Sequence, residues 1–266
     1  MTEILVIGNS HVASMKTGWD LIKLEYPSVR MEFFAAPVPH FGKLQLTNDG
    51  HFGVADDDAE VDEDLAKVML RLNKRTRISL ESFSMVYWAG YPWGLGRIIS
   101  SLHALNQPAI DKIDDRPAQN RFSLSAFQEI CRSAALQNKP SKIWGETLSG
   151  RLTLIPMALP SEAMIGNTAP KGMMPWKGYA ERGAPISRIF CYYESIFRDM
   201  TSEHGINLSS RPDEAIGVSG LTKALYSQGS IRLWNGEPHQ ENDYSHMNGK
   251  YGALVLRDLL DASRGM

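Results

Sequence analysis

A serine near the N-terminus and an acid–imidazole pair near the C-terminus are the residues whose types and spacing best suit chemistry. Ser10 follows a short apolar run, and Asp243 and His246 lie three residues apart. A serine hydroxyl is a weak nucleophile until a base removes its proton. A carboxylate that accepts from the far ring nitrogen of that base fixes its tautomer and stabilises the imidazolium. If the fold brings the two ends together, Ser10, His246 and Asp243 form a nucleophile, a base and an orienting acid.

The elements that must position Ser10 are a strand and a helix that follows it at once. Residues 4–7 form a continuous apolar run, as expected for a strand buried on both faces of a parallel sheet. Apolar residues then recur at helical spacing from Val12 to Ile22. In an open α/β sheet, ligands bind beyond the carboxyl ends of the strands, and the amides that open a helix favour a bound anion. We therefore expect Ser10 to lie in a binding site and Asn9 to contact the substrate.

The rest of the chain alternates strand patterns with helical patterns. Further strands are predicted at residues 31–36, 83–89, 152–157 and 206–208, and further helices at residues 60–72, 96–105, 123–136, 186–200 and 248–260. This alternation favours an α/β fold, a three-layer α/β/α sandwich with a mainly parallel central sheet. Since no repeat or clear linker interrupts the pattern, residues 1–266 are expected to form a single domain. The segment 165–184, rich in Gly, Pro and Met, is either a mobile flap or a packed loop.

The two ends of the chain resemble the signature blocks of the SGNH/GDSL hydrolases, a family of esterases and lipases. Gly8-Asn9-Ser10 is similar to the family's Gly-Asp-Ser block, and Asp243-x-x-His246 is similar to its last block. Residues 247–252 also resemble that last block, in which a helix of small residues packs back on the sheet. The two blocks bracket nearly the whole chain in the expected order. The resemblance implies an SGNH-hydrolase fold with flavodoxin-like layers, a serine nucleophile and hydrolysis of a carboxylic ester.

The middle of the chain departs from the family pattern at the oxyanion site. The family supplies a backbone amide at a glycine after the second strand and an asparagine side chain after the third. Gly42 matches the first position and Gly90 fits the second turn, but the asparagine is absent from Tyr91-Pro92-Trp93. The resemblance implies an oxyanion site at Ser10, Gly42 and Gly90. Either another group such as Trp93 or Asn48 replaces the missing side chain, or the enzyme is slow, or this member does something other than hydrolysis. Loss of one such donor typically lowers the rate by about 10²–10³.

Each of these residues also has a purely structural interpretation. Ser10 is suited to cap a helix, His246 to a surface or capping position, and Asp243 to a helix start. His11 is expected in the first helical turn rather than as a second base, because no carboxylate neighbours it in the sequence. Tyr91 and Trp93 are either core residues of the third strand or an aromatic wall of the substrate pocket.

The sequence predicts no metal site and no cofactor. The acidic residues Asp56, Asp57, Asp58, Glu60, Asp62, Glu63 and Asp64 lack EF-hand spacing and are typical of a solvated helix start. Gly94-Leu95-Gly96 lacks the third glycine and the downstream acid of a dinucleotide fingerprint. Cys131 and Cys191 show no metal-type spacing. They lie far apart in the sequence and do not suggest a disulfide framework, so we expect a reducing compartment.

Composition and charge restrict the class of protein. The chain has 266 residues, is 43% hydrophobic and carries a net charge of −2 with scattered Lys and Arg, which argues against a nucleic-acid partner. No stretch approaches the ~20 apolar residues of a membrane span. The N-terminus lacks the features of a secretory signal, so we expect a soluble, cytoplasmic protein. The sequence does not predict an oligomeric state.

The leading hypothesis is a serine esterase or deacylase acting on a small-molecule or carbohydrate ester. The alternative is an O-acyltransferase with the same triad, because aromatic residues and a flap would exclude water from the site. The missing oxyanion asparagine leaves open a third hypothesis, a catalytically inert binding module of this fold.

Overall fold

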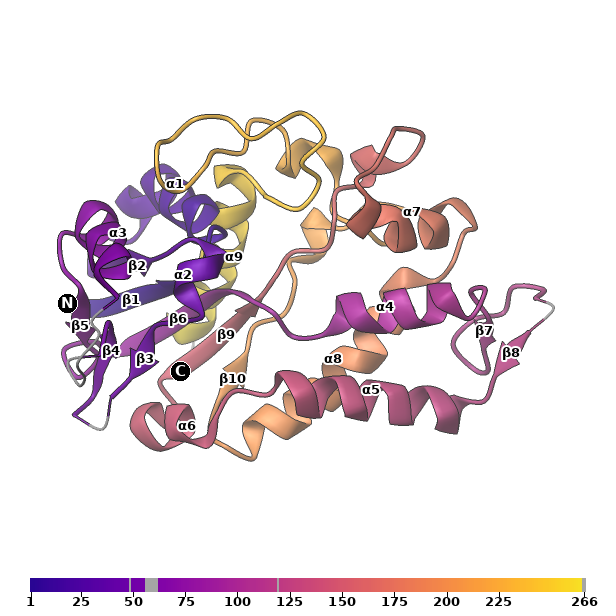
Figure 1. Ribbon diagram of the computed structural model, residues 1–266, viewed down its shortest axis with the longest axis horizontal. Coiled ribbons are helices and arrows are strands. Elements are labelled where there is room, and N and C mark those ends of the chain that lie inside the picture. Colours follow the sequence, from indigo (N-terminus) through magenta and orange to yellow (C-terminus); the bar gives the residue numbers. More distant parts are fainter. Residues whose placement is uncertain (48, 56–61, 119, 265–266) are drawn as a thin grey trace.

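Five parallel strands form the central sheet of the computed structural model, which describes residues 1–47, 49–55, 62–118 and 120–264 (Figure 1). The strands are β1 (Thr2–Gly8), β2 (Val29–Ala35), β6 (Met85–Tyr91), β9 (Leu152–Pro156) and β10 (Asn207–Leu208). Their spatial order is β10-β9-β6-β1-β2, and each neighbouring pair is parallel. The chain passes from β1 to β2 on one side and later returns to β6 on the other. The expected parallel sheet is confirmed.

β1 is buried on both faces, which explains its uninterrupted apolar run. Ile4 and Val6 belong to one hydrophobic cluster, and Leu5 and Ile7 belong to a second cluster on the opposite face. The first cluster includes residues of α1 (Val12–Ile22) and α9 (Gly249–Arg264), and the second includes residues of α3 (Glu63–Asn73), α4 (Leu95–Ala104), α5 (Leu124–Asn138), α6 (Lys142–Leu148) and α8 (Ile186–Ser202). Helices therefore cover both faces of the sheet, and the predicted three-layer α/β/α arrangement is confirmed.

The helices α1 and α9 approach each other so closely that their contact requires glycine. A Cβ atom on Gly252 would lie 1.9 Å from the carbonyl oxygen of Ser14. Such an overlap cannot be relieved by a rotamer change, because the obstructing atom belongs to the backbone. The first turns of α9 therefore lie against the first turns of α1, which begins just after β1. This contact brings the segment before α9 to the carboxyl end of β1.

Shorter elements connect these layers. After β2 come α2 (Val38–Phe41) and a three-stranded antiparallel sheet of β3 (Gln45–Leu46), β4 (His51–Gly53) and β5 (Arg77–Ser79). A parallel pair, β7 (Ala109–Ile110) and β8 (Arg121–Phe122), lies between α4 and α5 in the chain. The helix α7 (Met174–Glu181) packs against α4. Single 3-10 turns are η1 (Lys23–Glu25), η2 (Glu162–Met164), η3 (Lys171–Met173), η4 (Asp213–Ala215) and η5 (Ala224–Tyr226).

The predicted elements are present with shifted ends. The third strand of the sheet covers residues 85–91 rather than 83–89. The helix expected at 60–72 begins at Glu63, where the Asp62 side chain accepts from the Leu65 amide and caps the first turn. The small antiparallel sheet, the β7–β8 pair and α6 were not predicted, because elements of two to seven residues are too short to display a period. Asn48 and the acidic residues Asp56, Asp57, Asp58 and Glu60 lie outside the described residues.

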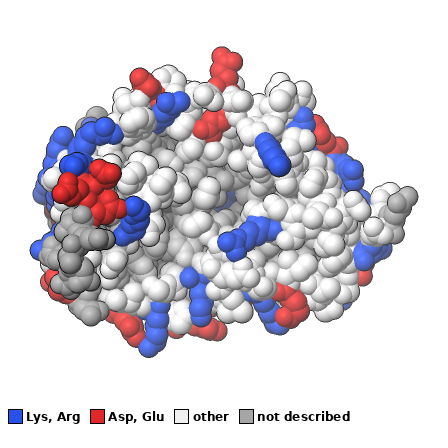
Figure 2. All heavy atoms as spheres, viewed as in Figure 1, with Lys and Arg blue, Asp and Glu red and all other residues white. Residues whose placement is uncertain are grey.

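Most charged side chains lie near the edge of the face shown in Figure 2, and some Lys or Arg side chains lie nearer its centre. Lys and Arg side chains alternate along the edge with Asp and Glu, and a hollow near the centre of this face is lined largely by uncharged residues. No helix within the described ranges combines the length and the hydropathy that crossing a membrane requires.

Candidate active site

Ser10 lies in the turn between β1 and α1, at the carboxyl end of the sheet. Its hydroxyl oxygen is 2.8 Å from Nε2 of His246. The N-cap of α1 is His11 rather than Ser10, so the structure does not support the capping interpretation of this serine. In the described part of the chain, the Ser10 amide has no hydrogen-bond acceptor, which leaves it available to a ligand.

The position of Ser10 follows from the topology of the sheet. The neighbours of β1 are β2 on one side and β6 on the other, so the direction of the strand order reverses there. At such a switch point the loops after the two central strands diverge, and a crevice opens beyond their carboxyl ends. Ser10 follows one of these strands directly, so its side chain lies at the crevice.

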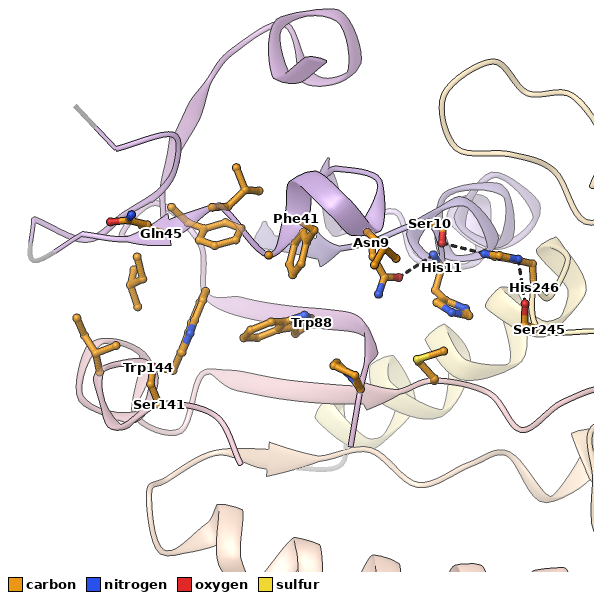
Figure 3. Close-up of a pocket in the computed structure, with 18 residues that line it drawn as sticks. Asn9, Ser10, His11, Phe41, Gln45, Trp88, Ser141, Trp144, Ser245 and His246 are labelled. Atoms are coloured by element: carbon orange, nitrogen blue, oxygen red, sulfur yellow. Dashed lines mark hydrogen bonds between the residues drawn. The ribbon is translucent and has the colours of Figure 1, made fainter. Parts of the chain in front are cut away.

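The acid–imidazole pair meets Ser10 at this crevice, and Figure 3 shows the His246 ring beside Ser10. The Nδ1 atom of His246 is 2.8 Å from Oδ2 of Asp243, and its Nε2 atom faces Ser10. The other carboxylate oxygen, Oδ1, accepts from the backbone amides of Ser245 and His246 and from the Ser245 hydroxyl. Hydrogen bonds to both carboxylate oxygens therefore hold the Asp243 side chain in place, and Asp243 in turn orients the His246 ring.

These hydrogen bonds set the charge of Asp243. Partial burial acts to raise the pKa of its carboxyl group, but hydrogen bonds from His246 and Ser245 outweigh this and hold the pKa well below its usual range. Asp243 is thus ionised at neutral pH. An ionised acceptor at Nδ1 of His246 directs the lone pair of Nε2 toward the Ser10 hydroxyl.

Two further histidines enclose His246. The His11 ring stacks on it with centroids 5.0 Å apart, and the His239 ring stacks on its other side with centroids 4.0 Å apart. Burial and the nearby His246 lower the pKa of His11 to about 3, and the same two causes lower the pKa of His239. Both flanking rings are therefore neutral at neutral pH, and His246 is the ring placed to accept a proton.

His239 also approaches the orienting acid. Its Nδ1 atom lies 2.8 Å from the same Asp243 oxygen that accepts from His246. Together, His239, Asp243 and His246 offer three donor atoms within 4.8 Å of one another, a spacing that a metal ion can bridge. The nitrogen lone pairs lie in the ring planes, and these planes are stacked and parallel to within 10°, so they do not meet at one point as tetrahedral zinc requires. Of the two histidine contacts to Asp243, that of His246 has the geometry of a hydrogen bond.

Asn9 is held rigidly beside Ser10. Its Nδ2 donates to the carbonyl of Gly90 at 3.0 Å, and its Oδ1 accepts from the amide of His11 at 3.1 Å. The two bonds together fix which end of the side-chain amide is nitrogen. The second hydrogen of Nδ2 has no acceptor in the described ranges, and Asn9 lines the cavity beside Ser10. It can therefore donate to a ligand there.

The two glycines expected at the oxyanion site have different surroundings. Gly42 ends α2 and lines the cavity, although its N–H is directed at the carbonyl of His40. Gly90 is absent from the residues that line this cavity; it lies at a register shift in β6 and supplies the carbonyl that holds Asn9. A Cβ atom on Gly90 would lie 2.5 Å from Oδ1 of Asn9, so glycine is required for this approach. The structure thus gives Gly90 a positioning role in place of the expected donor role.

The expected substrate contacts of Tyr91 and Trp93 are corrected by the structure. Both side chains are buried in the core: Tyr91 donates to the carbonyl of Asn138, and Trp93 packs against Phe190 and Tyr193. Neither lines the described cavities at Ser10. The register shift after Ala89 changes the direction of the following side chains. Trp93 therefore cannot replace the missing oxyanion asparagine, and residues 165–184 line neither cavity.

A cavity of about 720 Å³ extends from the triad into the protein. Figure 3 shows Ser10 and His246 at one end of its lining, Phe41 and Trp88 in the middle, and Trp144 at the other end. Sequence reasoning missed Phe41, Phe52 and Trp144, which come from three separate segments, and assigned Trp88 to the strand core. It also missed His239, for which the spacing of four residues before Asp243 was an available signal.

Comparisons with protein-family models, with curated proteins and with solved structures found no significant match to this chain.

Proposed function

We propose that this protein is a serine hydrolase that cleaves a carboxylic ester. The observation that carries the proposal is the continuous hydrogen-bonded line from the Ser10 hydroxyl through His246 to Asp243, with both links at 2.8 Å. This line couples a nucleophile to a base and the base to an ionised acid, as acyl transfer requires. The resemblance of both chain ends to the SGNH/GDSL hydrolases supports the same function.

In the first half of the reaction, the Ser10 oxygen attacks the ester carbonyl while His246 takes its proton. Asp243 stabilises the imidazolium that forms. The carbonyl oxygen becomes negative, and the free amide of Ser10 and the second N–H of Asn9 are the donors placed beside it. When the tetrahedral intermediate collapses, the alkoxide leaves with the proton from His246, and an acyl group remains on Ser10.

In the second half, water attacks this acyl-enzyme. His246 accepts a proton from the water and returns it to the Ser10 oxygen as the carboxylic acid departs. The neutral rings of His11 and His239 leave His246 as the single positive charge of the stacked trio during both halves.

Transfer of the acyl group to an alcohol remains the alternative outcome. The flap that motivated it is not supported, because residues 165–184 form η3 and α7 and line neither cavity. Exclusion of water is therefore not favoured by a specific observation, and hydrolysis is the simpler function.

The decisive test compares Ser10→Ala with Ser133→Ala, an exposed serine of α5. Hydrolysis of p-nitrophenyl butanoate is expected to fall by about 10⁴-fold or more in Ser10→Ala and to persist in Ser133→Ala. A fluorophosphonate is expected to label Ser10, as seen by peptide mass spectrometry. Equal residual rates in all three proteins, with no labelling, would leave an inert binding module as the better description.

A further inference from the structure

Ser10 and His246 lie at the junction of two cavities. The first is the cavity of about 720 Å³ that ends at Trp144, and the second, of about 500 Å³, lies on the other side of the triad. An ester has two parts, an acyl group and an alcohol, that meet at the carbonyl which Ser10 would attack. Two cavities at one nucleophile thus suggest one cavity for each part.

The middle of the first cavity is walled by aromatic side chains. Four aromatic side chains, Phe41, Trp88, Trp144 and Phe52, contact one another in a closed ring, with neighbouring centroids 4.8 to 5.8 Å apart. All four line the cavity, and its described lining contains no Asp, Glu, Lys or Arg. Apart from the indole N–H groups, of which that of Trp88 is buried without a partner among the described residues, these rings offer nothing to replace the hydrogen bonds that a polar group would lose from water.

The second cavity is also lined largely by apolar side chains, but it contains charged groups that the first cavity lacks. Arg71 and Arg232 line it together with Trp234, over whose ring the Arg71 guanidinium lies at 5.2 Å. Arg232 is 3.9 Å from Glu237, a weak ion pair at the edge of the molecule. Of the two described linings, only this one offers cationic partners to an alcohol part that carries polar or acidic groups.

We propose that the aromatic cavity binds the acyl chain, so that the preferred substrates are esters of medium-chain, apolar carboxylic acids. This inference rests on the proposed hydrolysis at Ser10 and gives its substrate class. The acyl carbon sits at Ser10, the chain extends past Phe41 and Trp88 toward Trp144, and the alcohol leaves through the second cavity. The bonds formed and broken are those of the hydrolysis described above.

Two isomeric esters separate the acyl part from the alcohol part. Ethyl octanoate and octyl acetate have the same atoms and similar hydrophobicity, but they carry the long chain on opposite sides of the carbonyl. Each methylene buried in the aromatic cavity is expected to raise kcat/KM about fourfold along the series from ethyl acetate to ethyl octanoate. The same series of alkyl acetates is expected to show a much smaller rise, with ethyl octanoate at least about tenfold better than octyl acetate.

A substitution at the far end of the cavity tests its length. Ser141 lines that end, is exposed and makes no capping hydrogen bond to α6, so a larger side chain there does not remove a structural contact. Ser141→Phe is expected to lower kcat/KM for ethyl octanoate and to spare ethyl acetate. Lys142→Phe is the matched control, because it adds the same ring to the next exposed residue, which is absent from the cavity lining.

A binding measurement keeps this inference separate from the proposed function. Ser10→Ala, which cannot form an acyl-enzyme, is titrated with octanoate and with acetate in a calorimeter. Binding of octanoate alone would support the cavity assignment, even if wild type hydrolysed no ester and the proposed function were wrong. Hydrolysis that is fastest for acetyl esters, or faster for octyl acetate than for ethyl octanoate, would overturn the assignment while leaving the hydrolase function intact.

Discussion

The burial of His11 leads us to expect a measurable loss of protein stability in weak acid. The residue is 8% exposed and stacks on His246. Burial, and after it the neighbouring His246, lower its pKa from 6.5 to about 3. The folded protein therefore keeps this ring neutral at pH values at which the unfolded chain protonates it.

The size of the effect follows from proton linkage. Between the two pKa values of His11, the unfolded chain binds one more proton at this residue than the folded protein does. Each unit by which the pH falls then lowers the free energy of unfolding by about 1.4 kcal/mol. The loss from pH 6.5 to about pH 5 is about 2 kcal/mol, and it stops growing below the folded pKa of about 3. His239 and Asp243 act in the same direction, since their pKa values are also lowered.

His11→Asn isolates the contribution of this residue. Urea unfolding of wild type and variant is measured at neutral pH and at about pH 5, and the two losses of free energy are compared. Any cost of replacing the ring that does not depend on pH cancels in this comparison. Wild type is expected to lose about 2 kcal/mol more than the variant between the two pH values. Equal losses would refute the conclusion that His11 is held neutral by burial beside the triad.

Three further predictions concern the site itself. Asp243→Asn places an N–H opposite Nδ1 of His246, imposes the wrong tautomer and is expected to lower kcat for ester hydrolysis by about 10⁴-fold; Glu241→Gln removes the same charge from the same loop and is expected to keep wild-type kcat. Gly90→Ala is expected to destabilise the protein in urea by at least about 2 kcal/mol more than Gly166→Ala, because both glycines have positive φ but only Gly90 meets Asn9 and His11. Dialysis against EDTA is expected to leave kcat unchanged, because the stacked, parallel ring planes at Asp243 do not meet at one point as a metal ion requires.

Each of these predictions can fail in a specific way. An Asp243→Asn variant that retained a tenth of wild-type activity would show that Asp243 is not needed to orient His246. Similar unfolding curves for the two glycine variants would show that the approach of Asn9 to the strand tolerates a methyl group. If activity were lost on dialysis and restored by zinc, His239, Asp243 and His246 would have to be interpreted as metal ligands.

The sheet and the triad could be predicted because their signals are local. A strand buried on both faces must be apolar at consecutive positions, and residues 4–7 display this directly. The spacing of Asp243 and His246 places both side chains in one turn, so their contact needs no knowledge of the rest of the fold. Their distance to Ser10 depends on α1 and α9, and the glycine that permits this contact was noted only through a family resemblance.

The cavity could not be predicted, because the residues that line it are far apart in the sequence. Its aromatic ring combines residues from α2, β4, β6 and α6, and no sequence period connects them. Trp93 was a candidate for the substrate pocket because it follows a strand. The register shift at Gly90 changes the direction of the backbone, and the Trp93 side chain is buried in the core. The proposed oxyanion donor at Asn9 was also hidden, since the position of its side chain depends on a hydrogen bond to a residue 81 positions away.

Ser10 and His246, whose side chains are hydrogen-bonded in the folded protein, are 236 positions apart in the chain. The ribosome therefore synthesises the proposed nucleophile long before the proposed base, and on the proposed mechanism a product that ends before Asp243 would hydrolyse no ester. If the chain were expressed as two fragments, one containing Ser10 and the other containing Asp243 and His246, neither fragment alone would be expected to hydrolyse esters. Hydrolysis on mixing them would then report that the sheet and its closing helix had reassembled.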